Sequence, residues 1–427
     1  MMSDGQNPIW AQSAAKRQTT PKLRQDTRTE IAIIGGGLSG LSAALHLARS
    51  GRSVTLIESR TLGWGGSGRN NGQVIPTLAA MEPDGMVKRY GDLAEPFIHL
   101  VRDSANYLFD LVKKHSLRCD AAQTGWFQPA HNPDYLKLSE ARVKAWQNHG
   151  APAELLDKAA CDALLGSTHW YGGMLNPTGG HINPLKLVYE LARVCTENGV
   201  DIFEQTPATR IERNGDAWRV STPNGQLSAD AVLLATNAYT GPLAPPIRRS
   251  FVPVTAWQAA TKPLNAAQQQ SIVPHRQAVS DTRGDLWYFR PTADYRLVTG
   301  AGLLLKTNAE PRLKRHLANR LATAFPQLGE PEFTHVWNGF VGITADFTPR
   351  FHKLGPNYFG FTGYNGRGLA LALSVGREFA KAINGEDNSL PFEPPRTIPF
   401  HGLVRHVARS RLILTRLRDR QPPRNLP

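Results

Sequence analysis

The stretch from residue 31 to residue 58 constrains the fold more than any other part of this 427-residue chain. It holds an apolar, β-branched run at 31–34, a G-x-G-x-x-G turn at 35–40, a helical apolar repeat and a second apolar run at 54–57. Glu58 follows, 18 residues after the last glycine of the turn. A buried strand, a glycine turn, a helix and an acidic residue in this order predict a Rossmann-type adenine-dinucleotide site.

Each part of this fingerprint has a physical task. Gly35 permits the tight turn, Gly37 lets the backbone approach a pyrophosphate, and Gly40 lets the helix pack closely on the strand. The helix N-terminus offers backbone N–H groups to the phosphate charge. Glu58 can accept hydrogen bonds from ribose hydroxyls, and its charge would repel the 2′-phosphate of NADP. The alternative interpretation is a glycine-rich structural turn, and the fingerprint by itself does not separate FAD from NAD.

Two further glycine-rich stretches follow. Residues 59–73 carry five glycines in 15 positions, so they cannot build a core but can wrap a ligand closely. Far along the chain, a short apolar strand at 358–362, a glycine loop at 363–368 and a small-residue helix at 369–383 repeat the strand–loop–helix pattern. We therefore expect a parallel sheet that is completed by distant parts of the chain.

The segments between these units alternate between helical and strand-like patterns. Apolar residues at helical spacing predict helices over 96–114, 134–147, 185–198 and 309–326. Apolar and β-branched runs predict a strand from Gly125, strands at 201–204, 208–212, 217–221 and 226–235, and a hairpin joining 287–290 to 295–298.

The net charge of +14 comes mostly from the two ends of the chain. Residues 1–29 carry +3 and residues 401–427 carry +6, which leaves +5 for the 371 residues between them. The body is only mildly basic, which argues against a nucleic-acid-binding protein and for an enzyme with basic tails. Residues 401–420 also mix arginines with apolar side chains, which is typical of a basic helix on a membrane surface or of a helix docked on the protein.

Composition also indicates the cellular compartment of the protein. The first 30 residues lack the apolar core of a secretory signal, and no apolar run approaches the ~20 residues of a membrane-spanning helix. Cys119, Cys161 and Cys195 are few, far apart and odd in number, which indicates reduced thiols rather than a disulfide framework or a metal site. We expect a cytoplasmic protein without a metal centre.

Four short motifs occur at Gly180–Pro184, Tyr288–Arg290, Trp337–Gly339 and Asp346–Pro349. Together with the strand that ends at Glu58 and the two later glycine loops, they resemble the FAD-dependent amine oxidases of the D-amino-acid oxidase-like superfamily. Within it, the chain is most similar to the group of bacterial gamma-glutamylputrescine oxidoreductases and L-pipecolate oxidases. The similarity covers about residues 28–400, although Asn71 stands where the group more often has glycine or another small residue.

The resemblance implies an α/β fold with two domains. A Rossmann-like FAD-binding domain would be assembled from the discontinuous segments 29–95, 160–240 and 330–385. A mixed-sheet α+β substrate domain would use the segments 96–159 and 241–329. The flanking segments would be a flexible basic arm and a basic C-terminal tail, at 1–28 and 386–427.

The resemblance also carries over a set of cofactor contacts. The family's ADP-binding positions match Gly35, Gly37, Gly40 and Glu58, and further contacts are expected at Leu38, Ser39, Ser59, Arg60 and Thr236. The loop that runs under the flavin would supply Gly66, Ser67, Arg69, Asn70 and Gln73. The loop that faces the pyrimidine end of the flavin would supply Gly363, Asn365, Gly366, Arg367 and Gly368. There a helix N-terminus can stabilise the negative charge of reduced flavin.

The FAD is expected to be non-covalent. Some relatives attach the flavin through a His in the loop that corresponds to 59–73 or through a Cys near Gly339. This chain has no His in that loop and no Cys after Cys195, so neither linkage is available.

The family reaction oxidises the C–N bond of an amine or amino acid by hydride transfer from the α-carbon to flavin N5, and water then hydrolyses the imine. The expected substrate is a small amine or imino acid, such as a gamma-glutamylated polyamine or pipecolate. The electron acceptor would be oxygen or a quinone of the respiratory chain, and a quinone would suit a peripheral membrane contact by the C-terminal tail. The alternatives are an NAD-dependent dehydrogenase, a tRNA-linked flavoprotein and a non-catalytic dinucleotide sensor.

Three residues are candidates for the substrate pocket: Arg290, Tyr288 and Trp337. Arg290 stands among aromatic residues, a setting that suits a substrate carboxylate or, alternatively, a strand arginine paired at the surface. Trp337 would flank the flavin by resemblance, or else lie in the core. For Tyr239 the sequence does not decide between a role in the pocket and simple packing. The setting of His181 is more typical of a structural histidine than of a catalytic base.

Overall fold

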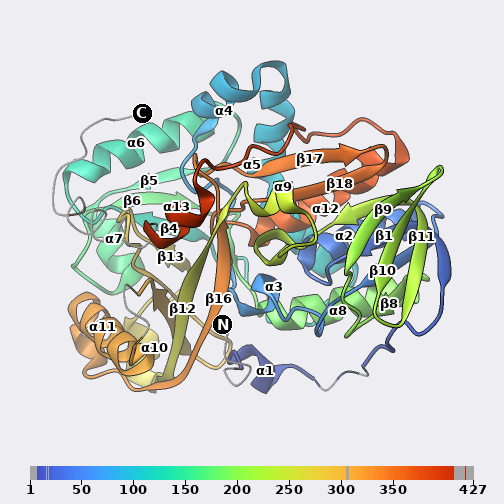
Figure 1. Ribbon diagram of the computed structural model, residues 1–427. Coiled ribbons are helices and arrows are strands. Elements are labelled where there is room, and N and C mark those ends of the chain that lie inside the picture. Colours follow the sequence, from blue (N-terminus) through green and yellow to red (C-terminus); the bar gives the residue numbers. More distant parts are fainter. Residues whose placement is uncertain (1–6, 16, 18, 304–306, 408–418, 420–427) are drawn as a thin grey trace.

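The computed structural model describes residues 7–15, 17, 19–303, 307–407 and 419. Within this part of the chain the strands form two eight-stranded sheets and one two-stranded ladder. The two large sheets lie side by side, the first on the right and the second on the left of Figure 1. This is the predicted fold class, an α/β protein with one largely parallel sheet and one mixed sheet.

The first sheet contains the dinucleotide fingerprint. Its strand order is β17-β18-β11-β1-β2-β8, and β10 and β9 extend it beside β11. The pairs β18–β11, β11–β1, β1–β2 and β2–β8 run parallel. The strands are β1 (Thr27–Ile34), β2 (Val54–Ile57), β8 (Asp201–Phe203), β9 (Arg210–Asn214), β10 (Ala217–Thr222), β11 (Gly225–Leu234), β17 (Arg350–Gly355) and β18 (Tyr358–Thr362).

The central strand β1 is apolar on both faces. Ile31 and Ile33 enter one core cluster, whereas Ala32 and Ile34 enter another on the opposite face. A strand whose alternate side chains enter two cores has to be apolar throughout, which explains the continuous run in the sequence.

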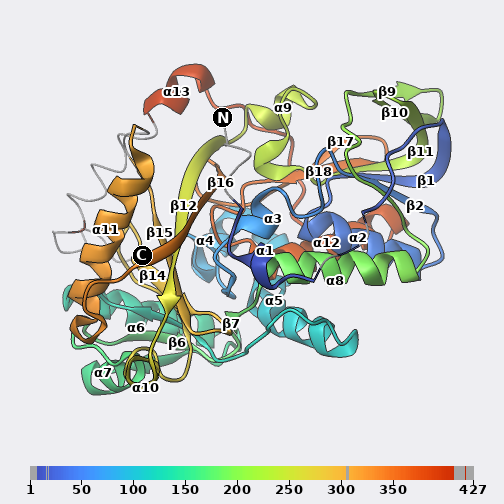
Figure 2. The same ribbon diagram turned by 90° about the horizontal axis from the view of Figure 1, so that it is seen from below.

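Helices cover one face of the first sheet, and in Figure 2 α8, α2 and α12 lie in a row below its strands. Their bounds are α2 (Leu38–Arg49), α8 (Pro184–Glu197) and α12 (Leu369–Asn384), with α5 (Ala94–Lys114) packed on α12. A Cβ added at Gly376 of α12 would lie 2.6 Å from the carbonyl oxygen of Ser39 on α2. The hydroxyl of Ser42 also donates to the carbonyl oxygen of Leu373 over 2.6 Å. These close contacts set the late glycine loop beside the early one.

The second sheet has the order β16-β12-β15-β14-β13-β4-β6-β5. Its strands are β4 (Trp126–Pro129), β5 (Glu154–Leu156), β6 (Gly173–Asn176), β12 (Val252–Pro263), β13 (Ala278–Ser280), β14 (Tyr288–Pro291), β15 (Arg296–Ala301) and β16 (Phe333–Ile343). The larger helices beside it are α6 (Asp134–Gln147), α7 (Lys158–Leu165) and α11 (Ala309–Ala324). The long antiparallel pair β12–β16 forms the side of this sheet that faces the first sheet (Figure 1).

The chain passes between the two sheets more often than the predicted ranges allow. Residues 173–176 and 333–343 were expected in the FAD domain, but they form β6 and β16 of the second sheet. Both segments are placed by long-range pairing, β6 with β4 and β16 with β12, which no local pattern records. The short ladder of β3 (Gln73–Val74) and β7 (Gly180–His181) lies at one of these crossings.

The described residues of the N-terminal arm pack against the protein, whereas a flexible arm was expected. Residues Trp10–Ser13 form the short helix α1, in which Trp10 is 3% exposed, and the neighbouring Ile9 is also buried. Leu23 is buried as well, and Thr20 donates to the buried carboxylate of Glu204. The segment is polar and aperiodic, so the isolated apolar anchors carry no helical or strand signal.

The remaining elements are short. Most of them connect larger elements, and α13 belongs to the C-terminal tail, which is described up to residue 407 and at residue 419. They are α3 (Gly66–Arg69), α4 (Pro83–Tyr90), η1 (Gly91–Leu93), η2 (Asn237–Tyr239), α9 (Pro245–Arg248), α10 (Ala266–Ser271), η3 (Pro326–Leu328) and α13 (His401–Val407). The apolar residues of the predicted basic helix, from 412 to 417, lie outside the described residues. None of the helices in the described ranges is long and apolar enough to cross a membrane.

Candidate active site

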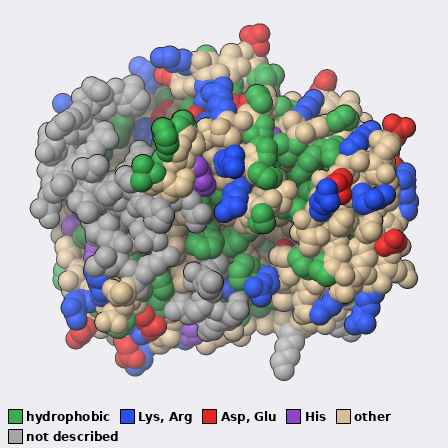
Figure 3. Space-filling model, viewed as in Figure 1, with side chains coloured by type: hydrophobic (Ala, Val, Ile, Leu, Met, Phe, Trp, Pro, Cys, Tyr) green, Lys and Arg blue, Asp and Glu red, His purple; other side chains and the backbone are tan. Residues whose placement is uncertain are grey.

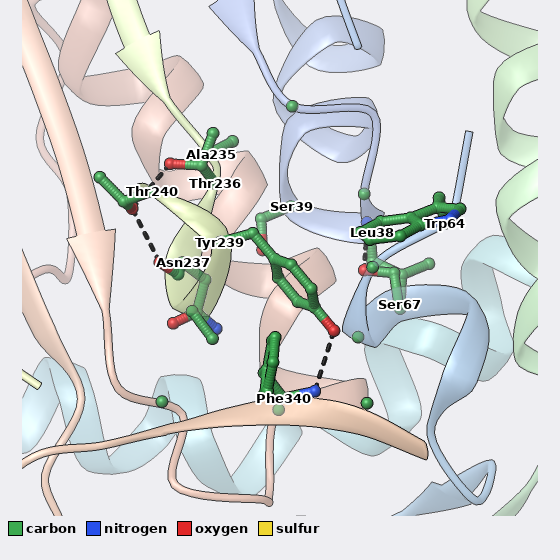
Figure 4. Close-up of a pocket in the computed structure, with 18 of the residues that line it drawn as sticks. Leu38, Ser39, Trp64, Ser67, Ala235, Thr236, Asn237, Tyr239, Thr240 and Phe340 are labelled. Atoms are coloured by element: carbon green, nitrogen blue, oxygen red, sulfur yellow. Dashed lines mark hydrogen bonds between the residues drawn. The ribbon is translucent and has the colours of Figure 1, made fainter. Parts of the chain in front are cut away.

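A cavity of about 610 Å³ lies between the first sheet and the β12–β16 side of the second. Its wall includes the ends of β1 and β2, the 63–73 loop, η2, the C-terminal half of β16 and the start of α12. Figure 4 shows part of this wall, in which Tyr239 of η2 reaches Phe340 of β16. The position matches the rule that ligands of parallel sheets bind at the carboxyl ends of the strands.

The fingerprint forms a rigid corner of the cavity. The N–H of Gly35 donates to the carbonyl oxygen of Ile57 over 2.8 Å, which joins β1 to β2 at their ends. The carboxylate of Glu58 accepts from the N–H of Gly36 at 2.8 Å and from the N–H of Arg60 at 2.9 Å. Gly35 has φ +118, a conformation that residues with a Cβ rarely adopt. The turn and the acidic residue are therefore one bonded unit.

Close approach explains the other two glycines of the fingerprint. A Cβ at Gly37 would lie 2.8 Å from Oγ of Ser67, and a Cβ at Gly40 would lie 2.2 Å from the carbonyl oxygen of Gly35. Oγ of Ser67 also accepts from the N–H of Leu38 at 3.1 Å. The 63–73 loop is thus attached to the start of α2, and both face the cavity.

The late glycine loop completes the wall beside α2. Asn365 has φ +52, and its side-chain oxygen accepts from the N–H of Thr344 at 2.9 Å. Asn365, Gly366 and Gly368 line the cavity together with the first turn of α12. The N-termini of α2 and α12 therefore both open on the same space, and each favours negative charge there.

Most of the predicted cofactor contacts line the cavity. They are Gly35, Gly37, Leu38, Ser39, Glu58, Ser59, Gly66, Ser67, Arg69, Asn70, Gln73, Thr236, Asn365, Gly366 and Gly368. Gly40, Arg60, Gly363 and Arg367 are not in the wall. The side chain of Arg367 turns into the protein, where it donates to Oγ1 of Thr77 at 2.6 Å and to the carbonyl oxygen of Leu78 at 2.7 Å. These two hydrogen bonds hold the late glycine loop against residues 77 and 78.

None of the three predicted pocket residues lies in the cavity wall. Arg290 is 2% exposed and donates to backbone carbonyls, including that of Asn71 at 2.6 Å. Trp337 lies on β16 and is fully buried, and Tyr288 lies on β14 with its hydroxyl directed at the carbonyl oxygen of Trp257. Arg290 is buried on the far side of the 63–73 loop, so the geometry supports neither of the two interpretations of its aromatic setting, a substrate carboxylate contact or a surface ion pair.

An aromatic group that sequence reasoning left undecided lies in the wall instead. The hydroxyl of Tyr239 accepts from the N–H of Phe340 at 2.9 Å, as Figure 4 shows, and its ring packs edge-on against Trp64 with centroids 5.8 Å apart. Burial raises the pKa of Tyr239 above its ordinary value, so the phenol stays neutral. The position of Tyr239 directly after the parallel strand β11 was the available signal, because strand ends meet at ligand sites.

The model for the DAO family, described as FAD dependent oxidoreductase, matches residues 30–382. The chain belongs to the DAO family. The probable oxidoreductase OrdL of Rhizobium meliloti is 32% identical over 389 residues, which cover 90% of this chain and 90% of that protein. The gamma-glutamylputrescine oxidoreductase of Escherichia coli is 30% identical over 388 residues, again 90% of both.

Solved structures confirm the fold that the DAO family implies. Glycine oxidase from Geobacillus kaustophilus superposes with a TM-score of 0.72 at 20% identity, covering 87% of this chain and 99% of that one. L-proline dehydrogenase from P. horikoshii gives a TM-score of 0.72 at 19% identity. The family match decides for FAD, which the fingerprint alone had left open against NAD, and it confirms the prediction of an FAD-dependent oxidoreductase.

The DAO-family cavity of this chain fits FAD on its own residues. Glu58 would offer its carboxylate to the ribose, the N-terminus of α2 would face the pyrophosphate, and α12 would supply a second helix N-terminus. The glycines keep both loops free of side chains at the points of closest approach. Within the described residues, no group of three or more His, Cys, Asp or Glu side chains is arranged to hold a metal ion.

Proposed function

We propose that this protein oxidises the C–N bond of a small amine, with a gamma-glutamylputrescine- or L-pipecolate-type compound as substrate. The observation that carries the proposal is the cavity, in which the dinucleotide fingerprint and one side of the second sheet form a continuous wall. The similarity to gamma-glutamylputrescine oxidoreductase over 90% of both chains supports this substrate class. When bound, FAD supplies the redox chemistry by accepting a hydride equivalent, and water hydrolyses the imine product.

The part of the wall that the second sheet contributes would bind the substrate. It is formed by Ala256 and Gln258 of β12 and by Phe340 and Val341 of β16, with the ring of Tyr239 beside them. These side chains exclude water and carry no formal charge. Because burial of an ammonium group without a counter-ion is costly, this surface favours the neutral form of the amine, from which hydride transfer starts.

An anaerobic titration of the purified protein tests the proposal. We expect flavin absorbance near ~450 nm, and acid should release the flavin because the FAD is non-covalent. Gamma-glutamylputrescine should bleach this absorbance. Bleaching by L-pipecolate instead would assign the substrate to the imino-acid type of the proposal. Bound flavin that no amine or imino acid of either type bleaches would contradict the proposal and leave a dinucleotide sensor.

We further propose that the C-terminal tail makes a peripheral contact with an anionic membrane and that a quinone is the electron acceptor. Phe400 and Leu403, at and next to the start of α13, are 83% and 66% exposed. Figure 3 shows hydrophobic side chains over α13 close to Lys or Arg side chains over α9, where Arg248 and Arg249 are exposed. Exposed apolar groups beside basic groups suit an anionic lipid surface.

Vesicle sedimentation and reoxidation kinetics test this second proposal. The protein should sediment with vesicles that contain phosphatidylglycerol, less with vesicles of phosphatidylcholine alone, and less again after Phe400→Ser and Leu403→Ser. Reduced enzyme should react faster with a soluble quinone than with oxygen. Equal sedimentation with both vesicles, or fast reaction with oxygen alone, would contradict it and identify a soluble oxidase.

A further inference from the structure

Two tryptophans from distant parts of the chain hold neighbouring carbonyl groups of the cavity wall. Nε1 of Trp337, on β16, donates to the carbonyl oxygen of Arg69 over 2.8 Å. Nε1 of Trp10, on α1, donates to the carbonyl oxygen of Asn70 over 2.9 Å. The two indole rings meet edge to face with centroids 5.8 Å apart, and both are buried.

Arg290 and Ile182 donate to the next two carbonyl groups of this segment. Its Nε donates to the carbonyl oxygen of Asn71 over 2.6 Å, and its guanidinium carbon lies 4.8 Å from the centre of the Trp10 ring. Its Nη2 donates over 2.8 Å to the carbonyl oxygen of Ile182. The N–H of Ile182 in turn donates to the carbonyl oxygen of Gly72 over 2.9 Å. Four consecutive carbonyls thus have donors. Three of the donors are side chains, and Trp10 packs against both of the others.

These contacts approach the wall from outside the cavity. Arg69, Asn70 and Asn71 line the cavity, whereas Trp10, Trp337 and Arg290 do not. The segment 69–72, here called the wall loop, therefore lies between the cavity and these three side chains. The carbonyl oxygens of residues 69–71, the negative ends of the peptide dipoles, are turned toward the three side chains and away from the cavity.

We propose that Trp10, Arg290 and Trp337 form a clamp that positions the wall loop for FAD, and that the N-terminal arm is thereby part of the cofactor site. The three residues are positioning residues, because none of them lines the cavity. The proposal rests on FAD binding by this DAO-family chain, and it is independent of which amine is oxidised.

The clamp acts in two ways. It pre-organises the wall loop, so that FAD does not have to order it on binding, which raises affinity. It also places a buried positive charge behind the loop, which favours the negatively charged reduced flavin. Burial lowers the pKa of Arg290 to about 9, and the guanidinium still carries its charge at neutral pH.

Trp10→Phe tests the first effect, because it keeps an aromatic ring and removes the N–H donor. Trp218→Phe is the matched control: Nε1 of Trp218 donates to the carbonyl oxygen of Pro356 over 2.8 Å, and its ring packs on Tyr358, on the first sheet. Titration of each apoprotein with FAD should give about 5-fold or weaker binding for Trp10→Phe and a change below about 2-fold for Trp218→Phe. Equal FAD affinities in the two variants would overturn the proposal and assign Trp10 a merely structural role.

Arg290→Met tests the second effect in an independent measurement. The midpoint potential of the bound flavin should become more negative, and Arg290→Lys should restore part of the change because it keeps the charge. An unchanged potential in Arg290→Met would overturn the electrostatic part of the proposal. Neither the titration nor the potential requires an amine, so the clamp can fail while the proposed amine oxidation stands, and the reverse.

Discussion

The carboxylate of Glu58 and the backbone N–H of Gly36 form a hydrogen bond of 2.8 Å that joins the two ends of the dinucleotide fingerprint. The same carboxylate accepts from the N–H of Arg60, so two backbone donors hold it at the edge of the cavity. A carboxylate fixed in this way would meet the ribose of FAD without reorganising, which gives a physical reason for the spacing seen in the sequence.

Replacement of Glu58 should weaken FAD binding more than it weakens folding. Glu58→Ala removes a charged acceptor from the ribose and leaves two N–H groups without their carboxylate, so we expect about 10- to 100-fold weaker FAD binding. Titration of the apoprotein with FAD measures the change. Glu30→Ala is the control, because Glu30 also accepts from a backbone N–H and pairs with Arg52 at the surface. Similar affinities in the two variants would contradict the assigned role of Glu58.

A methyl group at Gly40 should separate α2 from the turn before it. The added Cβ would lie 2.2 Å from the carbonyl oxygen of Gly35, and backbone cannot yield as a side-chain end can. Gly40→Ala should therefore lower both the thermal midpoint and the FAD content of the purified protein. Gly402→Ala, where a Cβ meets nothing within 4 Å, should leave both unchanged. A normal FAD content in Gly40→Ala would show that the turn is looser than the structure indicates.

Asn365 combines a backbone role with a side-chain role, and two substitutions separate them. Asn365→Gly keeps the φ of +52 accessible but removes the acceptor for the N–H of Thr344. Asn365→Ala loses the acceptor and also strains the backbone. We expect the thermal midpoint and the FAD affinity to fall in both variants. The free energy of unfolding should fall by about 1 kcal/mol more in Asn365→Ala than in Asn365→Gly. Equal stability of the two variants would remove the backbone role.

Buried histidines should make the protein less stable in acid. Burial, with Arg283 and His131 nearby, lowers the pKa of His169 to about 4, and burial beside Arg290 holds the pKa of His181 well below its usual value. The unfolded chain binds these protons below about pH 6.5 and the folded chain does not, so the free energy of unfolding falls as the pH falls from about 6.5 toward 4.

Urea midpoints measured between pH 7.5 and 4.5 check this prediction. The midpoint should fall below about pH 6.5, and His169→Gln should flatten the decline because it removes one proton that unfolding takes up. A midpoint that is constant or rises toward pH 5, or an unaltered slope in His169→Gln, would show that other groups govern the acid response.

Elements with a strong local period follow from the sequence. The predicted helix 134–147 is α6 with the same bounds, and the predicted strand 358–362 is β18. The loop between β18 and α12 was also placed correctly, because small residues after a short apolar strand indicate close approach. Helical and strand periods reflect burial of one face or two, which a local pattern records directly.

For residues whose role depends on a distant partner, the role predicted from the sequence differs from the one in the structure. Arg290 and Trp337 were expected beside the substrate, but their donors reach carbonyl oxygens of the 63–73 loop from behind. Trp10 was placed in a flexible arm because one aromatic residue in a polar segment has no period. Its partners lie 60 and 327 positions further along the chain, at Asn70 and Trp337.

The sequence by itself determined the dinucleotide fingerprint and the positions of the glycine loops, because glycine spacing and strand apolarity are local consequences of close approach and burial. Its resemblance to the family indicated FAD, which glycine spacing alone did not. Only the tertiary structure decided which side of those loops each buried side chain occupies. The cavity wall and the clamp behind it are separated by the thickness of one peptide segment, and that choice depends on pairings across the whole chain. The N-terminal arm belongs to the site for the same reason.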